Sequence, residues 1–398
     1  GVSRGLGDVY KRQQLVLSRA VGSGQHLSLN KGFWAGLIIN VLVAVVFWTL
    51  ITAFDKALIS KLTDNVALYA ETERYLAVAK FIITFNAITQ VMIALFNALG
   101  RTKVPFKGYL IELPVNMAMS YVLIHGFAGF EGIGVQGAAA GSLIAITIRL
   151  LYLTLCIRWD DSIVLSIKNL DASLKANTLN HFKEIFPVAA NVTMLQTGAT
   201  IYMLLYSQLT LNAYVAMTIV MPWIKAGTQF ITAWAHSSAI TISQAIGSRQ
   251  MDELRKNVDI SIDMAVMISF VSAAFFLALS FVLPDLYPDL DPSTYVALAS
   301  IAPLYIFLPI VRGYNTVHGH VLRALGKTTE VFKINFTGQW IVSIPLCALI
   351  ILHWDLSFFW AFAVMPFEEI VKALPFRHLA RKSLNEFDLK KAEKLMYD

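Results

Sequence analysis

The residues of this sequence best suited to chemistry are charged side chains that interrupt long apolar segments. Burying a charge in a bilayer is expensive, so such residues usually face a cavity or a partner. Glu112 and Arg149 lie on two successive segments, about 9 Å and about 12 Å from the same membrane face at 1.5 Å per helical residue. These similar depths predict an ion pair between the two helices. The alternative is that each side chain reaches the membrane surface separately.

Two deeper basic residues, Lys225 and Arg312, lie near the middle of their apolar segments. The nearest acids that could neutralise them are Glu368 and Glu369. A structural ion pair is one interpretation of either basic residue, and a position that lines a substrate cavity is the other.

A metal or catalytic site has little support in the sequence. His318 and His320 form the only suggestive pair, but helical residues two apart point about 200° from each other, so one ion cannot easily bind both. The polar segments contain no Ser/His/Asp set, paired-carboxylate motif or phosphate-binding glycine loop. We therefore expect no enzyme, no metal and no cofactor.

The composition places these residues in a membrane protein. Of the 398 residues, 57% are hydrophobic and only 15% are charged, whereas a soluble domain carries roughly a quarter. Apolar runs of about 20 residues, long enough to cross a bilayer as helices, recur along the chain. We predict an all-α polytopic membrane protein with ten spans, near residues 33–54, 74–97, 106–126, 133–157, 185–207, 213–235, 259–283, 294–322, 334–352 and 356–376.

The loop charges predict the orientation of the chain in the bilayer. All but three of the Lys and Arg residues in the loops and termini fall on one face of the predicted topology. This asymmetry is typical of cytoplasmic segments. It places the C-terminus in the cytoplasm, and it explains the net charge of +6 without a nucleic-acid partner.

An internal repeat divides the chain. LSRAVGSGQ at 17–25 resembles ISQAIGSRQ at 242–250, and ALGRT at 98–102 resembles ALGKT at 324–328. Ser18 and Ser243 are 225 positions apart, and the second pair of motifs is offset by 226. Six predicted spans separate Ser18 from Ser243, so both halves have the same orientation, as in transporters built from parallel repeats.

The repeat predicts the domain organisation. We expect a first transmembrane lobe at 14–157, a cytoplasmic connector at 158–184, a second lobe at 185–376 and a cytoplasmic tail at 377–398. Two spans precede the motif in the second half and none in the first, so we expect the first of two six-helix lobes to lack two helices. The polar residues 1–13 have no apolar signal-peptide core and are interpreted as a non-native leader.

Several motifs resemble the multidrug and toxic compound extrusion (MATE) family of secondary antiporters. They are SRAVGSGQ, SQAIGSRQ, FNALGRTKVP at 96–105, NMAMSYVLIHGFAGFEGIGVQGAAAGS at 116–142 and VRGYNTVHGHVLRALGKT at 311–328. The resemblance implies two lobes around a central cavity and export of drug-like compounds in exchange for Na⁺ or H⁺. It also implies a monomer in the bacterial inner (plasma) membrane.

The cation site of one branch of this family is matched only in part. That branch uses an Asp on the first helix, an Asn and an Asp four residues apart, and a Thr after G-A-A. Asn116 matches the Asn, Ser120 stands where the second Asp would be, and Ser142 replaces the Thr. Asn116 and Ser120 share a helix face. Either they contribute to binding, or they pack helices together as small polar residues do.

The acids of the other branch are not reproduced. It uses a Glu on the seventh helix and an Asp on the tenth. Leu195 or Gln196 takes the first position, and Arg312 sits near the second. The resemblance therefore leaves both Na⁺ and H⁺ as coupling ions.

One segment of the sequence contains side chains that suit a particular class of substrate. Aromatic and Met residues gather between 201 and 234, and such side chains suit flat organic cations. The set comprises Tyr202, Met203, Tyr206, Met217, Met221, Trp223, Phe230 and Trp234. The alternative for most of these side chains is that they face lipid or the protein core. Cationic amphipathic compounds are the predicted substrates. The alternative is a flippase for lipid-linked oligosaccharides, in which Lys225 and Arg312 would bind a pyrophosphate.

Overall fold

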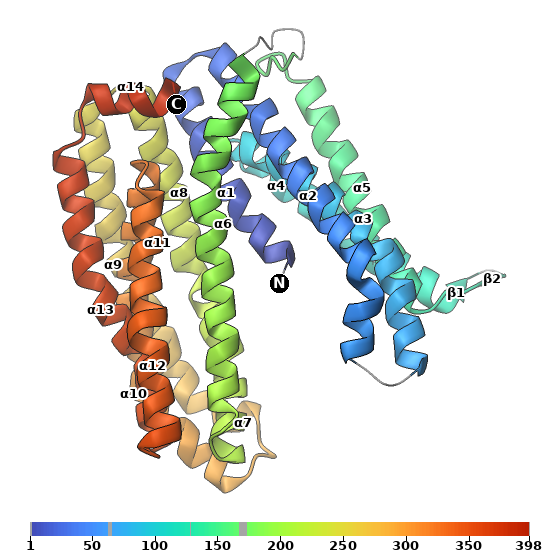
Figure 1. Cartoon of the computed structure of the whole chain (residues 1–398), viewed down its shortest axis with the longest axis vertical. Helices are drawn as coiled ribbons and strands as arrows, with labels where there is room; N and C mark the ends of the chain where they lie inside the picture. The colour runs from blue at the N-terminus through green and yellow to red at the C-terminus, as the bar shows by residue number, and fades with distance from the viewer. Residues whose placement is uncertain (1, 63–65, 128, 167–172, 398) are drawn as a thin grey trace. The chain divides into compact units, whose positions relative to one another are not determined.

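A computed structural model of the chain describes residues 2–62, 66–127, 129–166 and 173–397. Residues 1, 167–172 and 398, which belong to the predicted leader, connector and tail, lie outside the described residues. The described chain is almost entirely helical (Figure 1), which confirms the all-α fold class. A two-stranded hairpin pairs β1 (Gly126–Phe127) with β2 (Phe130–Glu131).

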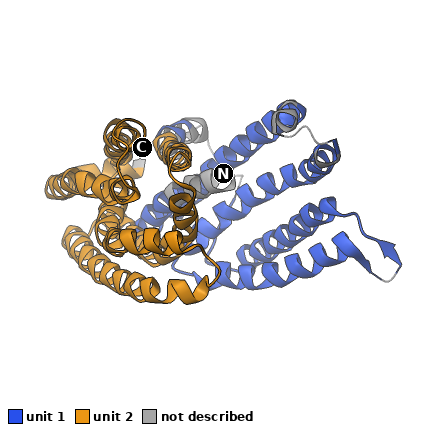
Figure 2. Ribbon diagram, turned by 90° about the horizontal axis from the view of Figure 1, so that it is seen from below, with its two compact units in different colours: residues 1–185, 398 blue, residues 186–397 orange. Residues whose placement is uncertain are grey.

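The chain forms two compact units, residues 1–185 and residues 186–397 (Figure 2). The first unit contains α1 (Val2–Ser23), α2 (His26–Leu62), α3 (Val66–Ala98), α4 (Lys103–His125) and α5 (Val135–Arg158). Helix α6 (Ser173–Tyr206) crosses from one unit into the other. The domain boundaries drawn from the sequence, including the leader at 1–13, stay predictions.

The second unit continues the helical chain to its end. Its elements are α7 (Leu211–Gly227), α8 (Gln229–Gly247), α9 (Met251–Leu286), α10 (Pro292–Ala324), α11 (Thr328–Phe336), the π-helical segment η2 (Thr337–Ser343), α12 (Ile344–Ala348), the π-helical segment η3 (Leu349–His353), α13 (Phe358–Asn385) and α14 (Leu389–Tyr397). The predicted span at 334–352 is therefore not a regular α-helix, since it alternates between two helical forms.

Seven helices of the described residues are long and apolar enough to cross a membrane. They coincide with seven of the ten predicted spans, and the other three fall on α4, on α7 with α8, and on α13. Helix α7 has only 17 residues, and α13 carries Glu368, Glu369 and Lys372 within its apolar stretch. The total of ten spans stays a prediction.

The predicted helix at 213–235 is interrupted, because α7 ends at Gly227 and α8 begins at Gln229. The Thr228 hydroxyl donates to the Ile224 carbonyl over 2.9 Å. Such local hydrogen bonds compete with the helix ladder, and Gly227 adds a residue of low helix propensity. The break lies two residues after Lys225.

The sequence repeat is also a repeat of local backbone structure. Gly24 and Arg249, 225 positions apart, follow the ends of α1 and α8 with positive φ angles of 68° and 60°. Gly100 and Gly326, 226 positions apart, follow α3 and α10 with φ angles of 72° and 81°. Left-handed residues of this kind commonly terminate helices. Each motif therefore stops a helix in the same way in both halves.

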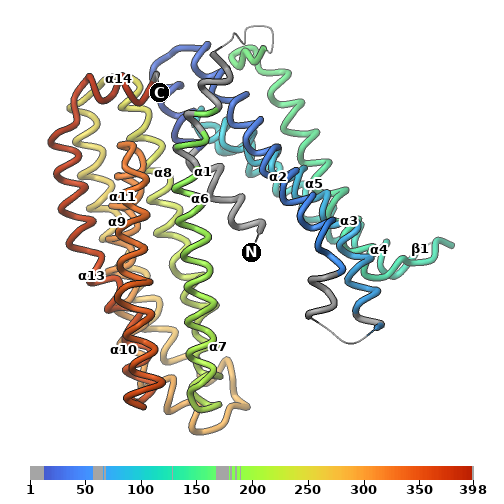
Figure 3. Tube along the Cα trace, in the orientation of Figure 1, coloured from blue at the N-terminus to red at the C-terminus, as the bar shows by residue number. Residues whose placement is uncertain are grey.

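Helix α3 packs against both α2 and α5 in the first unit (Figure 3). Helices α4 and α5 meet through Gly137 and Gly141, whose missing side chains leave room for the α4 backbone at Leu123 and Ser120. Small residues four apart allow this close approach of helices in membranes. The contact brings Ser120 close to the start of α5.

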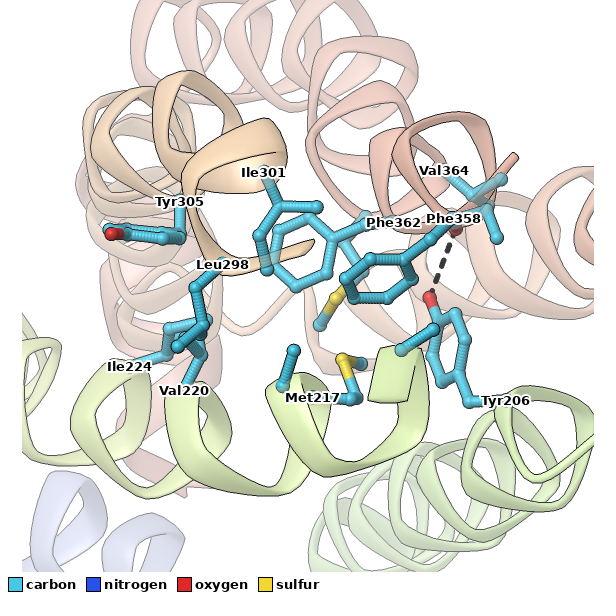
Figure 4. Packing of buried hydrophobic residues seen from close by; sticks show 14 of the residues in the cluster. Tyr206, Met217, Val220, Ile224, Leu298, Ile301, Tyr305, Phe358, Phe362 and Val364 are labelled. Atoms are coloured by element: carbon cyan, nitrogen blue, oxygen red, sulfur yellow. Dashed lines mark hydrogen bonds between the residues drawn. The ribbon is translucent and has the colours of Figure 1, made fainter. Parts of the chain in front are cut away.

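The core of the second unit is assembled from α6, α7, α9, α10, α12, η3 and α13, and Figure 4 shows part of this cluster. Met217, Val220 and Ile224 recur at helical spacing on one face of α7 and are fully buried. They pack in one apolar cluster with Tyr305 of α10. The Tyr206 hydroxyl donates to the Ala361 carbonyl over 3.1 Å and thereby joins α6 to α13.

We expect Gly141→Ala to destabilise the first unit, because an added Cβ would lie 2.6 Å from the Ser120 backbone nitrogen. Overpacking of this kind costs about 1–3 kcal/mol, and thermal unfolding of the purified protein in detergent measures it. The matched control is Gly319→Ala on α10, where the nearest atom to a Cβ is a Phe376 ring carbon at 3.6 Å. Equal melting temperatures for the two variants would contradict the close contact.

Candidate functional site

A cavity of about 360 Å³ opens inside the second unit. Side chains from α6, α7, α10, α11, η2 and α13 line it. Its volume is in the range of small-molecule sites, which combine an apolar lining with a few polar groups. The cavity contains Lys225, Arg312, Glu368 and Glu369, so the structure brings four of the sequence-predicted site residues together.

Helix α13 supplies a buried acid–base cluster to the cavity wall. Glu368, Glu369 and Lys372 are 7%, 7% and 5% exposed. Lys372 Nζ lies 3.0 Å from Glu368 Oε1 and 3.5 Å from Glu369 Oε1. Residues three and four apart are neighbours on a helix surface, so the local sequence itself creates these two ion pairs.

Two side chains of α10 contact Glu369 of this cluster. Arg312 Nε lies 3.3 Å from Glu369 Oε1. Asn315 Nδ2 donates to Glu369 Oε2 over 2.8 Å and to the Glu369 carbonyl over 2.7 Å. Arg312 and Asn315 are three residues apart and share a helix face. Both the side chain and the backbone of Glu369 are thus fixed to α10.

Helix α6 completes the network. The Tyr202 hydroxyl donates to Glu368 Oε2 over 2.7 Å. Each carboxylate is therefore satisfied by groups from two helices. Buried charges are tolerated when they are paired and hydrogen-bonded, and removal of one partner leaves an uncompensated charge.

Lys225 differs from these residues because its side chain is exposed in the cavity wall. It makes no ion pair with any residue that the structure describes. Arg312 is intermediate, since its side chain is 30% exposed and only its Nε meets Glu369. The ion pair predicted between either basic residue and the two acids thus forms for Arg312 and does not form for Lys225.

The three polar residues that resemble a cation site lie in the first unit. Ser120 Oγ and Ser142 Oγ both donate to Asn116 Oδ1, over 3.0 Å and 3.2 Å. They form one small cluster between α4 and α5. All three side chains are neutral, and the hydroxyl of Ser120 occupies the place that the family resemblance gives to a carboxylate.

Glu112 and Arg149 also lie in the first unit. Arg149 Nη1 is 2.5 Å from Glu112 Oε2, and the guanidinium stacks 4.4 Å from the centre of the Tyr109 ring. Arg149 is only 3% exposed. The two charges thus neutralise each other between α4 and α5.

Sequence reasoning missed Lys372, Asn315 and the role of Tyr202. Lys372 lies near the end of the predicted span at 356–376 and is not among the predicted site residues, but α13 continues to Asn385 and buries it. The spacing EEIVK, with acid and base four residues apart, was the signal that could have identified it. Asn315 and Tyr202 carried no such signal, because their partner Glu residues are more than 50 positions away.

The two His residues do not form a metal site. His318 Nδ1 bonds the Tyr314 carbonyl and His320 Nδ1 bonds the Thr316 carbonyl, each one helical turn earlier. Only His320 lines the cavity. Within the described ranges no group of three or more His, Cys, Asp or Glu side chains could hold a metal ion.

Comparison with known proteins identifies the family to which this chain belongs. The MatE family model matches residues 14–122 and 187–349. The probable multidrug resistance protein NorM of Rhizobium meliloti is 26% identical over 378 residues, covering 87% of this chain and 73% of the relative. The protein of the same name from Geobacillus kaustophilus is 26% identical over 376 residues, covering 88% and 78%.

Solved structures share the fold. The eukaryotic MATE transporter AtDTX14 superposes with a TM-score of 0.82 at 16% identity, covering 100% of this chain and 87% of that one. The Vibrio cholerae MATE transporter VcmN in its bent form gives 0.84 at 15% identity, covering 97% and 87%. At these identities the likeness establishes the fold alone.

We expect Glu112→Leu to lower the free energy of unfolding by about 3–5 kcal/mol, because it leaves the buried Arg149 without its carboxylate. The double variant Glu112→Leu/Arg149→Met should recover most of this loss. Thermal unfolding in detergent measures both. The control is Glu330→Leu, whose exposed pair with Lys333 is worth about 0.2–1 kcal/mol. A double variant no more stable than Glu112→Leu would argue against the pairing.

Proposed function

The chain belongs to the MatE family of multidrug efflux transporters, which are not enzymes, and on that basis we propose that it exports amphipathic organic compounds in exchange for Na⁺ or H⁺. The observation that carries this proposal is the charge network in the cavity of the second unit. A transporter must bind its substrate and its coupling ion at sites that water and both solutes reach in turn. A small cavity that contains both carboxylates and cations meets that need.

Glu368 and Glu369 are the proposed coupling groups. The acidic positions that the family resemblance assigned to the second lobe hold Leu195 or Gln196 and Arg312. In this chain the cavity carboxylates come from α13 instead. A proton or Na⁺ that reaches Glu368 competes with Lys372 for Glu368 Oε1, which lies 3.0 Å from the ammonium nitrogen. Loading of the ion would therefore weaken the contact between α13 and its neighbours.

Alternating access of two lobes is the proposed mechanism. The repeated helix ends at Gly24 and Arg249, and at Gly100 and Gly326, support two structurally related halves. We propose that the protein works as a monomer in the bacterial plasma membrane with its C-terminus in the cytoplasm, as the basic loops predict.

Few of the aromatic and Met residues that the sequence offers as substrate contacts lie in the cavity. Of the eight aromatic and Met residues between 201 and 234, only Tyr202 and Met221 line the cavity. Tyr206 and Met217 belong to the apolar core, and Phe230 is 75% exposed. A cationic drug stays the sequence-based prediction, and these side chains add little to it. The names of the relatives favour an efflux transporter over the lipid-linked oligosaccharide flippase.

We expect Glu368→Gln to lower dye efflux about tenfold, since one charge-assisted interaction is worth roughly 1.5–3 kcal/mol. Lys372 keeps Glu369 as a partner at 3.5 Å, so this variant should still fold. The measurement is ion-driven efflux of fluorescent organic dyes from liposomes that contain the whole purified chain, with Glu330→Gln as the surface control. Full efflux by Glu368→Gln would exclude Glu368 as the coupling group, and no efflux of any dye by the parent protein would refute the proposed transport.

A further inference from the structure

We propose that the cavity of the second unit recognises a carboxylate on the exported compound, bound by Arg312 and Lys225. This inference rests on the proposed export function and names the chemical class of its substrate. It differs from the expectation of a cationic drug because it starts from the charges that the folded cavity leaves unbalanced.

The first observation is the excess of positive charge. Even without Arg323, three basic side chains line the cavity, namely Lys225, Arg312 and Lys372, against the two acids Glu368 and Glu369. Both acids are already engaged by Lys372, Arg312, Asn315 and Tyr202. A cationic ligand would have to displace one of these partners, whereas an anionic ligand would not.

The second observation concerns the geometry of Arg312. Its Nε donates to Glu369, but no described residue accepts a hydrogen bond from its two terminal nitrogens, Nη1 and Nη2. A guanidinium presents its N–H groups as a planar fork that matches the two oxygens of a carboxylate. The side chain is 30% exposed in the cavity, so this edge of the fork is accessible to a ligand.

The third observation is the environment of Lys225. This ammonium group has no acidic partner among the described residues, although the helices around it carry apolar side chains. Attraction between opposite charges grows as the local dielectric constant falls, and unpaired charges at membrane depth mark substrate or ion pathways. An anion bound beside Arg312 would also compensate Lys225.

The rest of the cavity suits the organic part of such a compound. Leu195, Ile224, Met365 and Phe376 supply apolar surface. The buried Asn315 Oδ1 and Gln339 Oε1 have no hydrogen-bond partner in the described chain. Neither oxygen carries charge, and neither offsets the basic residues. An acidic compound with an apolar body therefore fits the basic and apolar parts of this lining.

A matched pair of dyes tests the proposal. Rhodamine 110 carries a free carboxylate and amino groups, and rhodamine 123 is its methyl ester, so the two differ at the acidic group alone. Binding of each dye to the purified full chain in detergent at low salt is measured by fluorescence anisotropy. We expect the acid to bind about tenfold more tightly than the ester, because charge-assisted hydrogen bonds to the carboxylate are lost on esterification.

Two variants assign the preference to this cavity. Arg312→Lys keeps a positive charge beside Glu369 but loses the fork, and Lys225→Gln removes a cation that has no ion pair to break. Each should weaken binding of the acid about five- to tenfold, the loss of one charge-assisted contact, and change binding of the ester less than about twofold. Lys333→Gln, at an exposed lysine of α11, should leave both affinities unchanged.

Three outcomes would overturn the inference: equal binding of acid and ester, tighter binding of the ester, or a preference for the acid that survives both variants. Lys225→Gln keeps the test decisive if Arg312→Lys fails to fold. Dye efflux from liposomes is measured in parallel. Efflux of the ester together with weak binding of the acid would reject the carboxylate site and leave the export function standing. Absence of all efflux, with the acid bound through Arg312 and Lys225, would reject export and keep the site.

Discussion

The carboxylate of Glu369 joins two helices of the second unit in a way that fixes both. It accepts a hydrogen bond from Asn315 and pairs with Arg312 on α10, while Lys372 approaches it from one turn further along α13. Asn315 also bonds the Glu369 backbone carbonyl, so the register of α13 against α10 is set at one residue. Partners for buried charges in such a protein must come from the protein itself or from a water-filled cavity. This contact holds α10 and α13 together at the cavity wall, beside the apolar clusters that the two helices share.

The same contact determines which polar groups of the cavity have no partner in the protein. Because both acids are bound by neighbouring helices, their charge is offset before any solute arrives. Among the described residues that line the cavity, the terminal nitrogens of Arg312, the ammonium of Lys225 and two buried amide oxygens have no hydrogen-bond or ion-pair partner. The network that stabilises the unit therefore also determines the sign of the charge that a ligand must bring. Coupling and substrate binding would act on one set of side chains, since a proton or cation at Glu368 alters the partners of Lys372.

In the first unit the polar residues between the helices leave no net charge. Glu112 and Arg149 neutralise each other, and the cluster of Asn116, Ser120 and Ser142 is uncharged. Both sets lie between α4 and α5, where glycines let the backbones approach closely. Small polar side chains at such a crossing hydrogen-bond across helices and stabilise packing. The cavity-lining basic residues Lys225 and Arg312 lie in the second unit, although the two halves end their repeated helices with the same left-handed turns.

The sequence by itself determined the helical membrane fold, the family and the internal repeat, because apolar length, loop charge and short motifs are local properties of the chain. It also singled out Lys225, Arg312, Glu368 and Glu369, since charge inside an apolar run is visible without a structure. Which of them pair was decided only by the tertiary structure. Arg312 and Glu369 are 57 positions apart, and no periodicity links residues on different helices. The burial of Lys372 was likewise set by packing, because propensity and hydropathy describe a helix alone and not the neighbours that surround it.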